Sequence, residues 1–154
     1  MTGGEGAYAL GIKLLSLRPR SEWELLRRME GRFGRDGAAA AIGRLKREGY
    51  VDDGSFARWW IDQRVTFKPT GSLRLRQELL QHGLDPGLVR DVLGTFTLAA
   101  ETEAALAAAR KKLSSPAGEP DDRRLSLFLA RRGFPRAVID TVLGALRGQD
   151  CDFY

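Results

Sequence analysis

The chain has 154 residues, of which 43% are hydrophobic and 29% charged, and its formal net charge is +5. This length is near that of one compact domain, and the excess of basic residues, largest between Lys13 and Glu48, favours polyanions or acidic protein surfaces as partners. The sequence has a single cysteine, Cys151, and no long apolar run or signal-peptide pattern, so we expect a cytoplasmic protein without disulfides or a membrane span.

The sequence repeats itself at a spacing of about fifty residues. Residues 75–94 and 125–144 align without a gap, so that Leu75 matches Leu125 and Gly83 matches Gly133. Because apolar positions and helix breakers recur together, the duplicated feature is a structural unit. Such an array offers an extended surface to a large partner instead of a single catalytic pocket.

We therefore predict an all-α fold of three tandem three-helix repeats that form an elongated, curved array. The predicted boundaries are 7–53, 54–97 and 98–147 for the three repeats, with terminal tails at 1–6 and 148–154.

The first repeat is expected to begin with a helix from Ala7 to Leu17. The run Ser21-Glu22-Trp23-Glu24 has the pattern of a capping box and predicts the start of the second helix. The segment that follows, from Phe33 to Leu45, is less regular, because Arg32 is predicted to stand where the other repeats have a helix-ending glycine.

The second repeat carries the clearest helix signals. Asp52 or Asp53 is a suitable N-cap for its first helix. The apolar stripe of this helix contains Phe56 and Trp60, which predicts a core position for Trp60. Trp59 lies about a hundred degrees round the same helix, so we expect it to be partly exposed.

A Lys-Pro-Thr-Gly run at 68–71 ends this helix, and Ser72 is predicted to cap the next one. Gly83 supplies the left-handed residue past the end of that second helix, and Leu84 is placed for the hydrophobic contact of a Schellman motif. Asp85 is the predicted N-cap of the third helix, which has proline at its first position.

The third repeat follows the same plan. Residues 100–113 favour a helix by propensity, and residues 114–120 are predicted to break it. The second helix is expected to start at Asp121 or Asp122 and to end at Gly133, after which a proline opens the third. The three repeats together predict nine helices and no strand.

No set of residues in the sequence predicts catalysis, a cofactor or a metal. His82, the only histidine, precedes a helix-ending glycine, where side chains commonly lie near the last carbonyls. Asp52 and Asp53 have no His or Cys at ligand spacing, which favours helix capping over metal binding. The glycines near the N-terminus follow no strand and lack the ending of a phosphate-binding loop. We therefore expect a protein that is not an enzyme and that acts by binding.

Basic side chains gather around the predicted loop at 68–71. The candidate contacts with a polyanion or an acidic protein surface are Arg58, Arg64, Lys68, Arg74, Arg76 and the aromatic Trp59. Such a cluster binds phosphates or acidic side chains. The alternative is a solvated face with local ion pairs to Asp62 and Glu78, and the sequence favours neither interpretation.

A set of residues at the start of the second repeat forms a recognisable signature. Its members are Gly49, Tyr50, Asp52, Asp53, Phe56, Trp60, Gly71, Leu75, Leu79 and Gly83, and the run 75–79 reads Leu-Arg-Gln-Glu-Leu. Together with the run from Leu15 to Leu25 and the threefold repeat, this pattern resembles the RecX family of bacterial recombinase regulators. The departures from the family pattern are Arg32, the alanine run 38–41 and the Asp-Cys-Asp-Phe-Tyr end.

The resemblance implies a protein that binds the nucleoprotein filament formed by the RecA recombinase on single-stranded DNA. It also implies that the protein lodges in the groove of that filament and limits its growth and its ATP-dependent strand exchange, in recombination, DNA repair and the SOS response. The signature residues would have a structural role. We also expect a direct contact with single-stranded DNA. The protein is expected to be a monomer. Two alternatives stay open, a DNA-binding regulator of the helix-turn-helix type and a non-catalytic helical adaptor.

Overall fold

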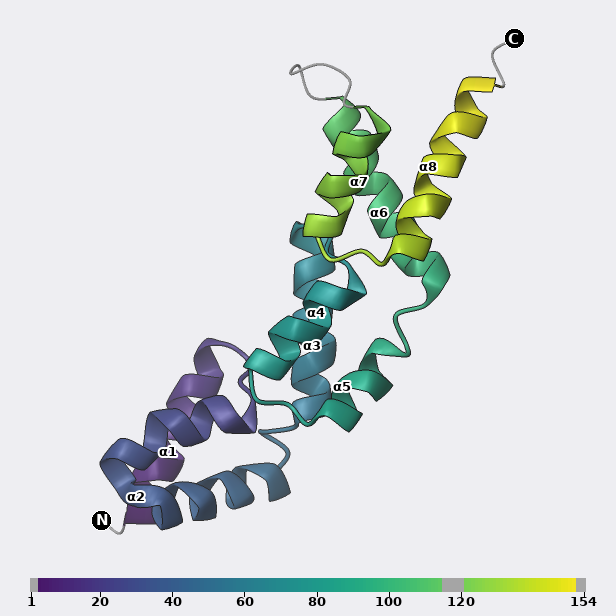
Figure 1. The fold of residues 1–154 in the computed structure, drawn as a ribbon. Coiled ribbons are helices and arrows are strands. Elements are labelled where there is room, and N and C mark those ends of the chain that lie inside the picture. The colour runs from purple at the N-terminus through teal and green to yellow at the C-terminus, as the bar shows by residue number, and fades with distance from the viewer. Residues whose placement is uncertain (1–2, 115–120, 152–154) are drawn as a thin grey trace. The chain divides into compact units, whose positions relative to one another are not determined.

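The computed structural model describes residues 3–114 and 121–151 and shows an all-helical chain (Figure 1). These residues form eight α-helices and no strand, which confirms the all-α prediction. The helices are α1 (Gly3–Leu17), α2 (Glu22–Arg47), α3 (Asp53–Phe67), α4 (Ser72–Gln81), α5 (Pro86–Leu93), α6 (Leu98–Leu113), α7 (Asp122–Arg131) and α8 (Arg136–Cys151). Of the predicted break at 114–120, all but Ser114 lies outside the described residues.

The helices group into two compact units. The first unit contains the described residues up to Trp60 together with Leu79–Val89, and the second contains Ile61–Glu78 and the described residues from Arg90 onward. Helices α3, α4 and α5 therefore each contribute residues to both units. The boundaries of the three repeats stay a prediction from the sequence.

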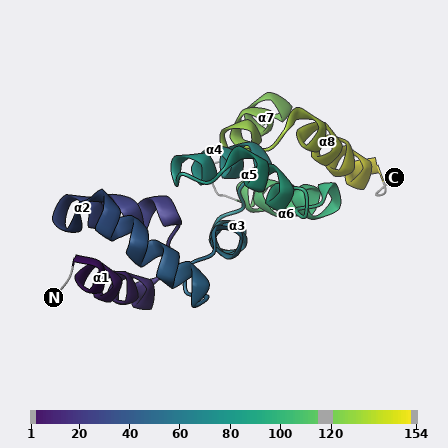
Figure 2. The same cartoon turned by 90° about the horizontal axis from the view of Figure 1, so that it is seen from below.

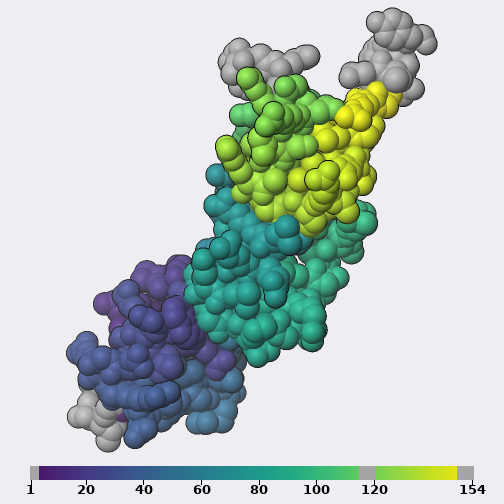
Figure 3. Space-filling view, in the orientation of Figure 1, coloured from purple at the N-terminus to yellow at the C-terminus, as the bar shows by residue number. Residues whose placement is uncertain are grey.

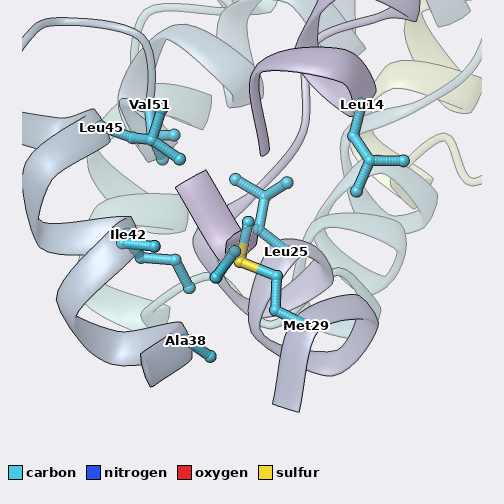
Figure 4. Packing of buried hydrophobic residues seen from close by; sticks show 9 residues of the cluster. Leu14, Leu25, Met29, Ala38, Ile42, Leu45 and Val51 are labelled. Carbon is cyan, nitrogen blue, oxygen red and sulfur yellow. The ribbon is translucent and has the colours of Figure 1, made fainter. Parts of the chain in front are cut away.

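The core of the first unit lies between α1 and α2, which lie side by side in both Figure 1 and Figure 2. Leu25 and Met29 of α2 are fully buried and cluster with Leu14 of α1. Figure 4 shows Leu25 beside Met29, and Leu45 beside Val51 at the edge of the same cluster. The apolar stripe of α2 thus faces α1, as expected for an amphipathic helix.

The alanine run at 38–41 belongs to this core. Ala38 and Ala41 are buried in the same cluster, while the two alanines between them are exposed. This alternation is that of one helical face. The small side chains therefore form part of the packing of the first unit.

Helix α1 begins earlier than predicted. It starts at Gly3, whereas the sequence predicts a tail at 1–6 and a helix from Ala7. A Cβ atom added to Gly6 would lie 2.6 Å from Cε1 of Phe33, so glycine at this position permits the close approach of α1 and the Phe33 ring. Glycine is a weak helix former, and a prediction from propensity therefore misses a helix whose glycines serve packing.

Helix α2 is interrupted at Gly34. Its φ of 75° and ψ of 163° are not helical and lie in a region that is essentially open only to glycine. The prediction that Arg32 stands at the breaker position is therefore wrong, because Gly34 breaks the helix two residues later. The nine predicted helices become eight in the described ranges because α2 continues on both sides of this break.

The helix-ending glycines of the second and third repeats are confirmed. Gly83 has a φ of 78°, and the N–H of Leu84 donates to the carbonyl of Leu79 at 3.3 Å, as in a Schellman motif. Gly133 repeats the arrangement after α7, with a φ of 90° and a 3.2 Å hydrogen bond from the N–H of the following residue.

The helix starts agree with the predicted aspartate caps and disagree with the predicted serine cap. Asp52 accepts a 2.9 Å hydrogen bond from the N–H three residues on and caps α3, and Asp85 and Asp121 act in the same way for α5 and α7. Ser72 does not cap α4, because it is the first residue of that helix. Its N–H donates to the carboxylate of Glu101, which serves one of the donors left open at a helix start.

The core of the second unit is formed by α6, α7 and α8, which pack against one another. Leu129 and Val142 are fully buried there, and Phe134 is nearly so. In the space-filling view of Figure 3, the side chains of α7 (green) and α8 (yellow) are in contact.

Helix α8 continues to Cys151, so the part of the predicted tail at 148–151 is helical, and residues 152–154 lie outside the described ranges. None of the helices in the described part of the chain combines the length and the apolar character that a membrane crossing requires.

Candidate interaction surfaces

Arg58 and Trp59 lie on α3 within the first unit. The guanidinium of Arg58 is exposed and donates to the hydroxyl of Ser55 at 3.3 Å. Trp59 is half-buried, and its ring centroid lies 6.0 Å from that of Phe56. Both side chains therefore keep part of their surface open to a partner.

Arg64 and Arg74 lie in the second unit and share one carboxylate. Arg64 donates to both oxygens of Glu78, from Nε at 3.0 Å and from Nη2 at 2.7 Å. Nε of Arg74 lies 3.4 Å from the same carboxylate, and its Nη1 donates to the carbonyl of Arg131. A bidentate, partly buried pair of this kind fixes geometry, so the local ion pairing that the sequence left open holds for these two arginines.

Lys68 and Arg76 differ from these two arginines. Both are exposed, and neither side chain has a hydrogen bond or an ion pair within the described ranges. Their charges are therefore available to an anionic partner without the loss of an internal contact.

A cationic and aromatic cluster on α6 and α7 is absent from the sequence-based predictions. Nζ of Lys112 lies 5.3 Å and Cζ of Arg132 lies 4.9 Å from the centroid of the Phe128 ring. Burial lowers the pKa of Arg132, and the charges of Arg74 and Arg64 lower it further. The spacing of Phe128 and Arg132 on one helical face could have signalled their contact, but nothing in the sequence places Lys112 beside them.

The first and second repeats meet at a junction inside the first unit. Oδ1 of Asp53 accepts the N–H of Glu22 at 2.9 Å, so a carboxylate at the start of α3 caps the start of α2. The hydroxyl of Ser21 donates to the carbonyl of His82 at 2.7 Å, and Nδ1 of His82 lies 3.0 Å from Oε1 of Glu24. The start of α2 is thus held by the start of α3 and by the residue that follows α4.

Aromatic rings surround the imidazole at this junction. The ring centroid of His82 lies 5.3 Å from that of Phe56 and 4.4 Å from that of Trp60. Phe56 is buried, but Trp60 is only half-buried. Trp60 therefore packs in this ring cluster at the junction and is not the fully buried core residue that the sequence predicts.

The second and third repeats meet at a similar junction inside the second unit. Oε1 of the buried Glu101 accepts the N–H of Ser72 at 2.6 Å. The N–H of Gly71 donates to the carbonyl of Arg132 at 2.8 Å, and the guanidinium of Arg132 donates to the carbonyl of Pro69 at 3.0 Å.

The two junctions are built in the same way. In each, the first residue of a repeat's second helix donates its N–H to a carboxylate in the first turn of the next repeat's first helix. In each, the preceding residue donates to the carbonyl just before a helix-ending glycine, from the hydroxyl of Ser21 at the first junction and from the backbone N–H of Gly71 at the second. Both pairs, Ser21–His82 and Gly71–Arg132, are separated by 61 residues. The repeat seen in the sequence therefore extends to the contacts that join the repeats.

The family-signature residues occupy structural positions. Phe56, Leu75, Leu79 and Gly71 are buried, Gly49 and Gly83 have positive φ, and Asp52 and Asp53 cap helices. Tyr50 is the exception, because 56% of its surface is exposed. The signature thus includes residues of both junctions, with Asp53 and Gly83 at the first and Gly71 at the second.

Comparison with known proteins agrees with this description. Residues 52–93 match the family model described as RecX, second three-helix domain. The regulatory protein RecX of Chlorobium phaeobacteroides (strain BS1) is 34% identical over 136 residues, which cover 86% of this chain and 88% of that protein. The regulatory protein RecX of Thermus thermophilus is 35% identical over 135 residues, which cover 88% of each.

Among solved structures, RecX from Lactobacillus salivarius superposes with a TM-score of 0.85 over 94% of this chain and 97% of that one, at 18% identity, which shows the same fold. The similar proteins are named as regulatory proteins. With about a third of the positions identical to those relatives over nearly the whole of both chains, this protein belongs to the RecX family.

Proposed function

We propose that this protein regulates the RecA recombinase by binding its filament on single-stranded DNA, mainly with an inhibitory effect, in recombination and DNA repair. The observation that carries the proposal is its similarity, over nearly the whole chain, to proteins named regulatory protein RecX. The repeated junctions support it, because an array of similar units suits a partner that is itself built of repeated subunits. The protein would act as a monomer in the cytoplasm by binding, without chemistry of its own.

The filament contact is expected to include exposed basic side chains that form no ion pair within the described residues. Lys68 and Arg76 are the best candidates, and the exposed Arg58 beside Trp59 is a third. Arg64 and Arg74 are held by Glu78, so we expect them to position neighbouring side chains more than to contact the partner. Such basic groups would meet acidic protein surface or DNA phosphate.

The proposal is tested by measuring ATP hydrolysis by RecA on single-stranded DNA with increasing amounts of this protein. Turnover should fall, and unchanged turnover at several-fold excess would contradict the proposal. A preference for one duplex sequence in a binding assay would favour the helix-turn-helix alternative instead.

The contact residues are tested with a double variant, Lys68→Ala with Arg76→Ala, in co-sedimentation with RecA filaments. Binding should weaken, and its dependence on salt should become less steep, because two cationic contacts are lost. The matched control is Lys13→Ala with Arg90→Ala, which removes the same charge at two other exposed positions. Equal retention of the two double variants would show that Lys68 and Arg76 do not contact the filament.

A further inference from the structure

The first unit contains a hollow of about 490 Å³ that none of the predicted contacts uses. It is lined by Glu22, Trp23, Leu26, Ala39, Ile42, Gly43, Lys46, Asp53 and Gly83. Its volume lies within the range of about 300–1,000 Å³ that is typical of ligand sites. Its apolar lining includes Leu26, Ala39 and Ile42 of α2. Its polar edge is formed by Glu22 and Asp53, at the starts of α2 and α3, and by Lys46 near the end of α2.

Trp23 gives the hollow a fixed aromatic wall. Its side chain packs so closely on Gly83 that a Cβ atom added there would lie 2.3 Å from Cγ of Trp23. The residue is nevertheless 41% exposed, so part of the indole stays open. Cζ of Arg27 lies 4.9 Å from its ring centroid, so one guanidinium of the chain itself already stacks on this ring.

The polar edge of the hollow has more negative than positive groups. Asp53 and Glu22 lie next to each other there, and one ammonium, that of Lys46, pairs with Glu22 at 2.9 Å. Burial raises the pKa of Asp53, and the charge of Glu22 adds to the rise. A cation from outside would therefore be favoured beside Asp53, since it would neutralise a partly buried carboxylate.

We propose that this hollow binds an arginine side chain, flanked by an apolar residue, from a protein partner. The guanidinium would lie between Asp53 and the open part of the Trp23 ring, and the flanking apolar group would pack on Leu26 and Ile42. Arginine suits the site better than lysine, because its planar group pairs with a carboxylate and stacks on an aromatic ring at once. Where the partner is the recombinase filament, this inference rests on the proposed function.

The first test uses short capped peptides, Ala-Leu-Arg-Leu-Ala and its counterpart with glutamine in place of arginine, and the full-length protein labelled with ¹⁵N. We expect saturable shifts of the Trp23 indole N–H and of the Gly43 and Gly83 amides. The glutamine peptide should bind about tenfold more weakly, because it leaves Asp53 without a charged partner. Equal binding of the two peptides, shifts that spare Trp23, or no shift at millimolar peptide would each overturn the proposal.

The second test fills the hollow with Gly43→Leu. A Cβ atom at Gly43 meets only Nη1 of Arg47, at 3.4 Å, so the variant should fold and melt no lower than the wild type. The control is Gly31→Leu, the same change in the same helix at an exposed position where a Cβ meets nothing. Gly43→Leu should bind the arginine peptide about tenfold more weakly than Gly31→Leu, as expected when a side chain fills the space that the ligand needs.

Co-sedimentation with RecA filaments separates this inference from the proposed function. A wild-type protein that does not bind filaments would refute the proposed function, while the peptide experiment would still decide the role of the hollow. Filament binding that is weakened by Gly43→Leu and not by Gly31→Leu supports both. Equal filament binding by the two variants would overturn the assignment of the hollow to the recombinase and leave the proposed function standing.

Discussion

Nδ1 of His82 lies 3.0 Å from Oε1 of Glu24, and this contact joins the residue after α4 to the first turn of α2. The same Glu24 completes the capping box with Ser21 and pairs with Arg18 at 2.5 Å. Its side chain is only 12% exposed. One carboxylate therefore serves the start of a helix and the junction between two repeats.

Loss of this carboxylate should destabilise the protein. We expect Glu24→Gln to lower the free energy of unfolding by about 1–3 kcal/mol, because Arg18 and His82 lose a charged partner. Urea denaturation followed by circular dichroism measures the change. Glu30→Gln, at an exposed position of the same helix, is the control, with an expected change within about 0.5 kcal/mol. Equal midpoints for the two variants would show that the contact adds nothing to stability.

The contribution of Glu24 should depend on pH with a definite sign. Burial opposes its ionisation, but the hydrogen bond and charge of Arg18 and the charge of His82 outweigh burial and hold the pKa of Glu24 below its ordinary value. A carboxyl of this kind stabilises the fold above its unfolded pKa of about 4.3, and this stabilisation is lost as the pH falls through the lower folded value. The difference in unfolding free energy between the wild type and Glu24→Gln should therefore shrink below about pH 4. A difference that stays constant between neutral and acid pH would contradict this assignment.

A substitution at Gly34 should destabilise the protein, although there is space for a side chain at this position. Its φ of 75° and ψ of 163° are strained for any residue with a Cβ atom, and apart from the adjoining backbone no atom lies within 4 Å of the Cβ position. We expect Gly34→Ala to cost about 1–3 kcal/mol of stability for conformational reasons alone. Gly31→Ala, three residues earlier in α2, should instead stabilise by up to about 1 kcal/mol. Thermal melts that shift in the same direction for both variants would refute the break at Gly34.

Glu101 should matter for the second unit more than its neighbour Glu103. Glu101 is 5% exposed and accepts the N–H of Ser72 at 2.6 Å, whereas Glu103 is exposed on the same helix. We expect Glu101→Ala to destabilise by about 1–3 kcal/mol, because a backbone donor at the start of α4 loses its partner. Glu103→Ala should change stability by less than about 0.5 kcal/mol. Amide hydrogen exchange at Ser72 would show the effect directly, and unchanged protection in Glu101→Ala would contradict it.

Arg64 and Arg76 should separate stability from binding. Arg64→Ala removes a bidentate partner of Glu78 and should cost about 1–3 kcal/mol of stability, a range that allows for its partial exposure. Arg76→Ala should leave the melting temperature unchanged and weaken binding to RecA filaments. The opposite result, an unstable Arg76→Ala and a stable Arg64→Ala, would reverse the roles given to these residues.

The sequence predicts the features of the fold that depend on local chemistry. Gly83 and Gly133 are recognised because a glycine before an apolar residue is the local signal of a helix end. Asp52, Asp85 and Asp121 are recognised because an N-cap bonds an N–H only two or three residues away.

The features that depend on distant partners escape prediction. The prediction aligns Arg32 with the helix-ending glycines of the other repeats, whereas the residue of α2 with a positive φ is Gly34. The sequence predicts Ser72 as the cap of α4. It gives no local sign of the carboxylate that accepts the N–H of Ser72, because Glu101 lies 29 residues further on. The sequence likewise does not decide the role of Arg64, because an ion pair with Glu78 is only one of the two interpretations that it allows.

The second helices of the second and third repeats differ in which residue accepts the backbone N–H groups of their first turn. The N–H of Ser72 depends on Glu101 of the following repeat, while α7 takes its cap from the adjacent Asp121. The third repeat could therefore be transplanted behind another helical segment with its second helix already capped. The second repeat would lose the acceptor at the start of its second helix, because cutting the chain after it leaves the N–H of Ser72 to water.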